Sequence, residues 1–270
     1  MEITGKTAIM FILGDPIAHV LGTAVLNGHF ARCQLDVAAC PLHVLPQDLG
    51  PTVAMLRQLR NVIGFGVTVP HKIAIVPMLD HLTQNGRLVG AVNFVRRSRD
   101  GRFTGDNVDG MGFVGGLHAH GVAVVNGTVL QIGAGGAGRA IAFAVASSGA
   151  KRLAIVNRSM NKAADLARAV QAAFPTCEVT NRMPDLADVD LVINATTLGM
   201  NAADPLPLDP VGLRPGMAVA EVIMRPQTTA LLREAARRGA TVVPGRAMLE
   251  HQIALAADFL LDGACASQAC

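Results

Sequence analysis

The chain has 270 residues, of which 51% are hydrophobic, and its formal net charge at pH 7 is only +3. This length exceeds what one α/β core usually organises, so two domains are expected. The small charge and the absence of Trp and Tyr argue against nucleic-acid binding, and no apolar run reaches the roughly 18 residues of a membrane span.

The first part of the chain alternates between apolar runs typical of strands and segments typical of helices. A first strand is expected over residues 8–13 and ends at Gly14-Asp15-Pro16. After it we expect a helix over 24–33, a strand over 36–41, a helix over 49–59, a strand over 62–69 and a helix over 73–82. A hairpin turn follows at Asp100-Gly101. The alternation predicts an α/β domain spanning residues 1–108.

The turn Gly105-Asp106-Asn107-Val108-Asp109-Gly110 marks the expected domain junction, before a helix over 111–119. In the second domain, residues 109–244, an apolar run over 129–132 leads into glycines spaced G-x-G-x-x-G and an alanine-rich helix. Later expected elements are strands over 153–156, 191–194, 217–223 and 241–244 and a helix over 162–174. This order is typical of a Rossmann dinucleotide-binding domain.

The glycine-rich loop has the spacing of a phosphate-binding turn. Gly133 would permit the tight turn, Gly135 the close approach of backbone to a pyrophosphate, and Gly138 the packing of helix on strand. The N-terminus of the following helix would face the phosphates. The loop therefore predicts a nicotinamide or flavin dinucleotide bound by Gly133, Ala134, Gly135, Gly136, Ala137 and Gly138.

The residues after the second strand of this domain bear on the choice between NADP and NAD. An acidic side chain there would bind the adenosine ribose and repel a 2′-phosphate, but this chain has Asn157, followed by Arg158 and Ser159, with Lys162 one turn later. A guanidinium, a hydroxyl and an ammonium suit the extra phosphate of NADP. The alternative is that Arg158 stacks on the adenine and Lys162 is solvated, so the sequence favours NADP without excluding NAD.

A last helix is expected over residues 245–261 and has Met248, Gln252 and Leu255 near one face. The segment 245–270 would return to the first domain. The five cysteines show no C-x-x-C spacing, so no metal site is expected, and the N-terminal stretch shows no secretion signal. We therefore expect a cytoplasmic protein, a monomer or a homodimer, that does not bind a membrane.

Several motifs in one order, covering nearly the full length, resemble the shikimate/quinate dehydrogenase family. They are Gly14-Asp15-Pro16-Ile17-Ala18-His19, Val67-Thr68-Val69-Pro70-His71-Lys72, Gly90-Ala91-Val92-Asn93, Gly105-Asp106-Asn107-Val108-Asp109, the phosphate loop, Asn194-Ala195-Thr196-Thr197-Leu198-Gly199-Met200 and Gly245-Arg246-Ala247-Met248-Leu249-Glu250-His251-Gln252. The resemblance implies a two-domain oxidoreductase of aromatic amino acid biosynthesis. Such an enzyme moves a hydride between NAD(P) and the hydroxyl-bearing ring carbon of a cyclic hydroxy acid.

The same resemblance assigns roles to individual residues. Lys72 and Asp109 would flank the reacting hydroxyl, with Lys72 as acid/base and Asp109 as its orienting partner, although the opposite assignment stays open. Thr68, Asn93 and Gln252 would contact the substrate. The nicotinamide side of the cofactor site would be lined by Asn194, Ala195, Thr196, Gly245 and Met248; a buried core position for Met248 is the alternative.

The chain departs from the family where the substrate carboxylate is bound. Two serines of the family's H-S-x-S-P run are missing from His19-Val20-Leu21-Gly22-Thr23. Four other polar residues of the family, an asparagine, two threonines and a tyrosine, are replaced by Gly66, by Phe94 and Val108, and by Met224. A buried carboxylate would lose several hydrogen bonds, each worth about 1 kcal/mol or more. The hypothesis is a dehydrogenase for which shikimate is a poor substrate, with a replacement anion contact open among His19, Thr23, His71 and Arg225. The alternative is a non-catalytic regulatory protein that binds a dinucleotide or metabolite.

Overall fold

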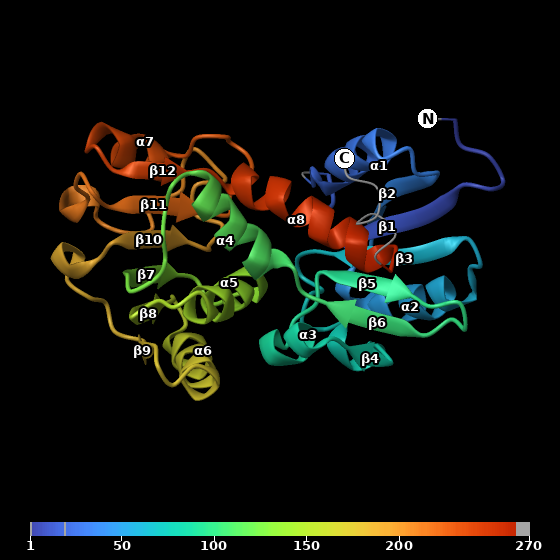
Figure 1. Cartoon of the computed structure of the whole chain (residues 1–270), viewed down its shortest axis with the longest axis horizontal. Helices are drawn as coiled ribbons and strands as arrows, with labels where there is room; N and C mark the ends of the chain where they lie inside the picture. Colours follow the sequence, from blue (N-terminus) through green and yellow to red (C-terminus); the bar gives the residue numbers. More distant parts are fainter. Residues whose placement is uncertain (1, 19, 263–270) are drawn as a thin grey trace. The chain divides into compact units, whose positions relative to one another are not determined.

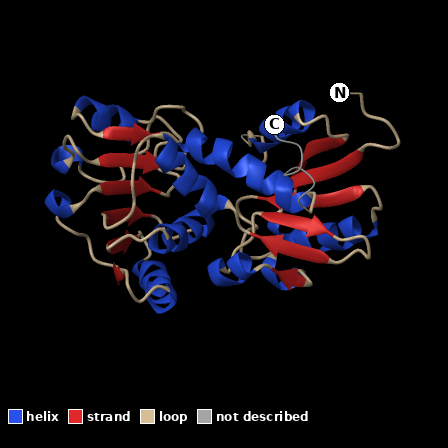
Figure 2. Ribbon diagram, viewed as in Figure 1, coloured by secondary structure: helices blue, strands red, loops and turns tan. Residues whose placement is uncertain are grey.

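The computed structural model describes residues 2–18 and 20–262. By their contacts these residues divide into two compact units, each described here by itself. Unit 1 holds the described residues up to Val108 and from Gln252 onward, and unit 2 holds Asp109–His251. Helices and strands alternate along both units (Figure 2). No helix in the described part of the chain is long and apolar enough to cross a membrane.

Unit 1 is built on a six-stranded sheet in the order β2-β1-β3-β5-β6-β4. Strand β5 runs antiparallel to its neighbours β3 and β6, and the other neighbouring pairs are parallel. The strands are β1 (Ala8–Gly14), β2 (Val37–His43), β3 (Val62–Val67), β4 (His81–Leu82), β5 (Phe94–Arg97) and β6 (Phe103–Asp106). The predicted hairpin at Asp100-Gly101 is confirmed between β5 and β6.

Helices of unit 1 cover this sheet and close its core. They are α1 (Gly22–Arg32), α2 (Leu49–Gln58), α3 (Gln84–Val89) and the second half of α8 (Gly245–Leu260), with 3-10 turns at Pro46–Asp48 and Val76–Met78. The largest core side chains include Phe65 and Phe103, whose rings meet edge to face at a centroid distance of 5.1 Å. This arrangement is a favourable one for aromatic rings.

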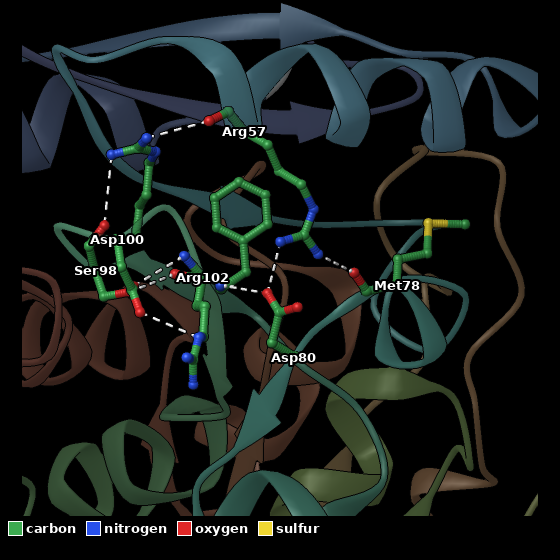
Figure 3. Close-up of polar contacts among 8 residues, drawn as sticks. Arg57, Met78, Asp80, Ser98, Asp100 and Arg102 are labelled. Carbon is green, nitrogen blue, oxygen red and sulfur yellow. Dashed lines mark hydrogen bonds and ion pairs between the residues drawn. The ribbon is translucent and has the colours of Figure 1, made fainter.

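Arg57 of α2 connects the helix to the β-hairpin, as Figure 3 shows. Its guanidinium lies 4.5 Å from the centroid of the Phe103 ring and donates to Asp80 Oδ2 at 2.6 Å and to the carbonyl of Met78 at 2.8 Å. Asp80 also accepts a hydrogen bond from Phe103 N at 2.7 Å. The backbone bond from Phe103, followed by the bond from Arg57, lowers the pKa of Asp80. These bonds hold β6 against α2.

Unit 2 contains a second six-stranded sheet, all parallel, in the order β12-β11-β10-β7-β8-β9 (Figure 1). Counted from β7, this is the 3-2-1-4-5-6 order of the Rossmann fold. The strands are β7 (Thr128–Ile132), β8 (Arg152–Val156), β9 (Glu178–Thr180), β10 (Leu191–Asn194), β11 (Ala218–Glu221) and β12 (Thr241–Val243). The chain order reverses between β7 and β10, where such folds bind their ligands.

The helices of unit 2 are α4 (Asp109–Ala119), α5 (Gly136–Ser147), α6 (Met160–Ala173), α7 (Ala230–Arg237) and the first part of α8, with 3-10 turns at Leu186–Asp188 and Pro210–Gly212. Helix α4 starts very close to α5, because a Cβ added at Gly110 would lie 2.4 Å from the carbonyl oxygen of Ala140. Only glycine fits there. The predicted fold class, an α/β protein with a Rossmann sheet, is confirmed.

One expected element is wrong and three are missed. The apolar run after Lys72 predicted a helix over 73–82, but the chain forms turns, a 3-10 turn and the short strand β4, because Pro77 cannot supply a helical N–H. Helices α3 and α7 and strand β9 were not expected. They are short, with six, eight and three residues, so their sequence pattern is weak.

Candidate active site

The predicted substrate residues of unit 1 gather at one edge of its sheet. Because β5 runs opposite to β3 and β6, its first residue lies at the edge where those two strands end. Thr68 and Lys72 follow β3, Asn93 directly precedes β5, and Asn107 and Val108 follow β6; the next residue, Asp109, is the first of unit 2. The antiparallel strand is therefore what brings these chain segments to a common edge.

Asn93 ties the three segments together. Its carbonyl accepts from Val67 N at 2.7 Å, its N–H donates to the carbonyl of Asp106 at 3.0 Å, and its side-chain Oδ1 accepts from Val108 N at 3.0 Å. The side chain is only 4% exposed. Asn93 thus fixes the backbone immediately before Asp109, which is itself buried at the start of α4.

The segment that carries Lys72 is a turn held by backbone bonds. His71 N donates to the carbonyl of Thr68 at 2.9 Å, and Val92 N donates to the carbonyl of Lys72 at 2.8 Å. Lys72 is half-buried. The neighbouring His71 is 1% exposed and its ring Nε2 bonds the carbonyl of Val44 at 2.7 Å. His71 therefore anchors this turn to the core, and its role as a contact for a substrate anion stays a prediction.

Gln252 of α8 carries an unsatisfied acceptor. The residue is 7% exposed, and its Oε1 atom has no hydrogen-bond partner among the described residues. A buried amide oxygen without a donor costs about 1–3 kcal/mol. A ligand hydroxyl would satisfy this atom, which fits the predicted substrate role of Gln252.

The other candidates for replacing the lost carboxylate contacts lie in different parts of the chain. Thr23 is half-buried in the first turn of α1, a helix that has no side-chain cap at its N-terminus. Arg225 is exposed in unit 2, where it lines a cavity of about 470 Å³ between the segments after β10 and β11. His19 lies outside the described residues.

The phosphate loop of unit 2 has the close approaches that its glycines predicted. Gly133 has a φ of +115°, and a Cβ there would lie 2.7 Å from the backbone of Ala195. A Cβ at Gly138 would lie 2.5 Å from the carbonyl oxygen of Gly133. A Cβ at Gly135 would meet nothing within 4 Å, so no group of the chain requires glycine there. This open space at a helix N-terminus is what a bound pyrophosphate would fill.

Gln131 supports the phosphate loop, and the sequence did not predict this role. It is fully buried in β7, and its Nε2 donates to the carbonyls of Gly133 at 2.9 Å and Gly138 at 2.8 Å. One amide therefore braces both ends of the loop. The available signal was a polar side chain in the middle of an apolar strand directly before the glycines.

The residues predicted to choose the cofactor follow β8. Asn157 Oδ1 accepts from Ala134 N at 3.4 Å and its Nδ2 donates to the carbonyl of Ser159 at 3.1 Å. Asn157 thus connects the phosphate loop to the start of α6. Arg158, Ser159 and Lys162 are exposed around that helix start. Their side chains are accessible to a ligand.

The predicted nicotinamide side is built from the ends of β10 and β11 and the start of α8. Asn194 is fully buried; its Nδ2 donates to the carbonyl of Leu198 at 3.0 Å and its Oδ1 accepts from Thr196 Oγ1 at 2.7 Å. These bonds close the loop that contains Ala195. A Cβ at Gly245 would lie 2.4 Å from the carbonyl oxygen of Ile223, and Met248 is buried at 4% exposure.

No cluster of three or more His, Cys, Asp or Glu side chains that could hold a metal ion occurs in the described ranges 2–18 and 20–262. The candidate residues instead offer amides, a hydroxyl and a lysine in unit 1, and glycine backbone, amides, hydroxyls, cationic side chains and the Asp109 carboxyl in unit 2. This set suits a polyhydroxylated ligand in unit 1 and a dinucleotide in unit 2.

Known proteins match both units. Residues 12–95 match the model of the shikimate dehydrogenase substrate binding domain, and residues 119–201 match that of shikimate / quinate 5-dehydrogenase. The shikimate dehydrogenase (NADP(+)) of Rubrobacter xylanophilus is 39% identical over 256 residues, which cover 93% of this chain and 89% of that protein. The chain belongs to the shikimate/quinate dehydrogenase family.

Two solved structures of similar proteins extend this result. A shikimate dehydrogenase in complex with NADP+ has a TM-score of 0.90 and 31% identity, with 97% of this chain and 92% of that chain covered. The 5-ketofructose reductase of Gluconobacter sp. strain CHM43 has a TM-score of 0.85 and 28% identity, with 96% and 94% covered.

Membership of the shikimate/quinate dehydrogenase family confirms the predicted reaction class. The chain is an oxidoreductase, an NAD(P)-dependent dehydrogenase that acts on a CH–OH group, and its cofactor is NADP or NAD. The family supports this enzymatic interpretation over that of a non-catalytic regulatory protein.

Proposed function

We propose that this protein interconverts a ring hydroxyl and a ring carbonyl on a cyclic hydroxy acid related to shikimate or quinate, with NADP preferred to NAD, and that shikimate is not its best substrate. The substrate would contact Thr68, Asn93 and Gln252 in unit 1. The orphaned Oε1 of Gln252 and the open space at Gly135 support a ligand in each unit.

Lys72 is the proposed acid/base. A bound nicotinamide would supply the acceptor for the hydride that leaves the ring carbon. As the carbonyl forms, neutral Lys72 takes the hydroxyl proton, and in the reverse direction its ammonium returns that proton. Asp109 orients Lys72, and its carboxylate balances the positive charge of Lys72 when the lysine is protonated. Asn93 supports this arrangement because its bond to Val108 N fixes the residue before Asp109.

The altered substrate preference is supported by how two of the sequence departures pack. Phe94 faces Gly66 across the antiparallel β3–β5 pair, and a Cβ added at Gly66 would lie 3.3 Å from the Phe94 ring and 3.3 Å from Ile12. The ring therefore stands in the space next to the position where the family carries an asparagine. Two polar family positions are replaced by one apolar pair, which cannot hydrogen-bond a carboxylate.

Restoring both family residues is expected to raise activity on shikimate. Gly66→Asn alone should destabilise the protein by about 1–3 kcal/mol, because the new side chain overpacks against Phe94. Adding Phe94→Thr should relieve this strain and raise kcat/KM for shikimate by about tenfold or more, as two hydrogen-bonding groups return. Steady-state kinetics and thermal melts test both expectations.

Phe94→Thr alone is the matched control, because it removes the ring without adding the asparagine. If the double variant is no better on shikimate than the unmodified enzyme, the apolar pair does not determine specificity. The broader test is turnover of shikimate, quinate, aminoshikimate and ring-saturated analogues with both cofactors. Shikimate turnover at the efficiency usual for the family would refute the altered-pocket proposal.

The NADP preference rests on Arg158. Arg158→Ala is expected to weaken NADP+ binding by about tenfold, the equivalent of one charge-assisted hydrogen bond to the 2′-phosphate. Binding of NAD+ should change less than about twofold, because it lacks that phosphate. Arg152→Ala, an exposed arginine at the other end of β8, is the control. An equal loss for both cofactors would mean that Arg158 contacts the adenine instead.

A further inference from the structure

Glu221 is a buried carboxyl group that the proposed chemistry does not use. It is the last residue of β11, is 1% exposed, and faces Asn194 across the parallel β10–β11 pair. Its Oε2 accepts from Thr229 Oγ1 at 3.0 Å. Its Oε1 has no hydrogen-bond partner among the described residues. A buried carboxylate with one oxygen unsatisfied lowers the free energy of unfolding, so its presence calls for an explanation.

Two neighbours of this carboxyl, Asn194 and Thr229, hold the segments around the proposed nicotinamide side. Asn194 closes the loop 195–199 by its bonds to Leu198 and Thr196. Thr229, the other neighbour, caps α7 by accepting from Leu232 N at 3.2 Å. A Cβ at Gly199 would lie 3.4 Å from the Cβ of Thr229, so the loop and the helix cap touch. Directly after Glu221, the backbone of Val222 and Ile223 packs on Gly245 of α8.

We propose that Glu221 is a positioning residue for the nicotinamide half of the cofactor, and that it fixes the loop 195–199 and the α7 cap in binding geometry only while it is protonated. This inference rests on the proposed cofactor site in unit 2. Deprotonation places an unshared negative charge between Asn194 and Thr229, and these groups must then reorient to solvate it.

Burial keeps Glu221 partly protonated at neutral pH. Desolvation raises the pKa of Glu221 from its ordinary value of 4.5 to about 7, against smaller opposing contributions from Thr229 and Asn194. Asn194 is near enough to lower this pKa, although Oε1 makes no hydrogen bond of ordinary geometry. As pH rises, the unfolded chain loses this proton first, so the stability that Glu221 contributes is present below pH 4.5 and is lost through pH 7.

Among the residues that the structure describes, no charged side chain compensates the carboxyl. Strands β10 and β12, which pair with β11, carry none. On α7, Arg233 donates to the carbonyl of Thr228 and Glu234 pairs with Arg237 and Arg238. Arg225 in the preceding segment is exposed, and Arg246 of α8 pairs with Glu250. The nearby polar groups that act on Glu221 are therefore Thr229 and Asn194.

The test compares NADPH binding by the full-length protein with that by Glu221→Gln, which keeps the size of the side chain and stays neutral. The ratio of the two Kd values, unmodified protein over variant, is expected to rise by about five- to tenfold between pH 6 and pH 8. Taking the ratio removes titration of the cofactor's own 2′-phosphate, whose pKa near 6 affects both proteins equally. Glu234→Gln, a surface acid of α7, is the matched control and should give a constant ratio.

Thermal melts without cofactor supply the second readout. Between pH 5 and pH 8 the Tm of the unmodified protein should fall relative to that of Glu221→Gln. A constant Kd ratio, whether or not the melts diverge, would overturn the positioning role. If the unmodified protein binds no NADPH at either pH, the proposed cofactor function fails and this inference with it, an outcome that differs from pH-independent binding.

Discussion

Lys72→Met is expected to lower kcat by about 10²- to 10⁴-fold, the range associated with a general acid/base. The Tm and the Kd for NADPH should stay close to those of the unmodified enzyme, because methionine keeps most of the side chain and the Lys72 turn is held by backbone bonds. Stopped-flow single-turnover assays would separate this chemical defect from slow product release.

Lys6→Met, an exposed lysine of the same unit, is the control and should leave kcat unchanged. A kcat for Lys72→Met within about threefold of the unmodified value would remove Lys72 from the chemistry. Asp109→Asn distinguishes the two proton assignments. If Asp109 only orients Lys72, the variant keeps a pH-dependent residual rate; if Asp109 is the base, the acidic limb of the kcat/KM profile for substrate oxidation disappears.

Gly135→Ala is expected to weaken NADPH binding by about 10- to 100-fold while the protein stays folded. The new methyl group meets no atom of the chain within 4 Å, and the φ of −80° at Gly135 is allowed for alanine. The free energy of unfolding should therefore change by less than about 1 kcal/mol. The methyl group would instead displace the pyrophosphate and break charge-assisted bonds of about 1.5–3 kcal/mol each.

Two other alanine substitutions serve as comparisons. Gly50→Ala on α2, also without a neighbour within 4 Å of the added Cβ, should leave NADPH binding unchanged. Gly138→Ala should destabilise the fold itself, because its Cβ would lie 2.5 Å from the Gly133 carbonyl oxygen. Tight NADPH binding by Gly135→Ala would show that the phosphates do not approach this loop.

The Rossmann unit was the more predictable part of the fold, because its signals are local. The spacing of Gly133, Gly135 and Gly138 reports backbone constraints that few other structures impose, and the strand at 191–194 coincides with β10. In unit 1 the helix expected over 73–82 fails because Pro77 interrupts it, and Ile75 is the one residue of this described run that is buried. The hydrophobic pattern alone does not distinguish a helix from an irregular segment of similar composition.

The candidate site, like the fold, was predictable where its sequence signals are local. The motif order predicted which residues would touch ligands, and both these contacts and their roles remain predictions. Gln131 and Glu221 were missed because each is a single polar residue in or at the end of an apolar strand, and its structural role depends on partners elsewhere in the chain. The Gly66 and Phe94 departures were visible singly, but their mutual packing follows from the register of β3 and β5.

The two bonds from Gln131 to the carbonyls of Gly133 and Gly138 have a consequence for coenzyme association. The loop acquires its shape from the chain's own bonds, before any dinucleotide arrives, so capture requires little loss of conformational entropy in that segment. Affinity differences between related nucleotides should then originate in their direct contacts with the protein, and the recognition element behaves as a preorganised receptor.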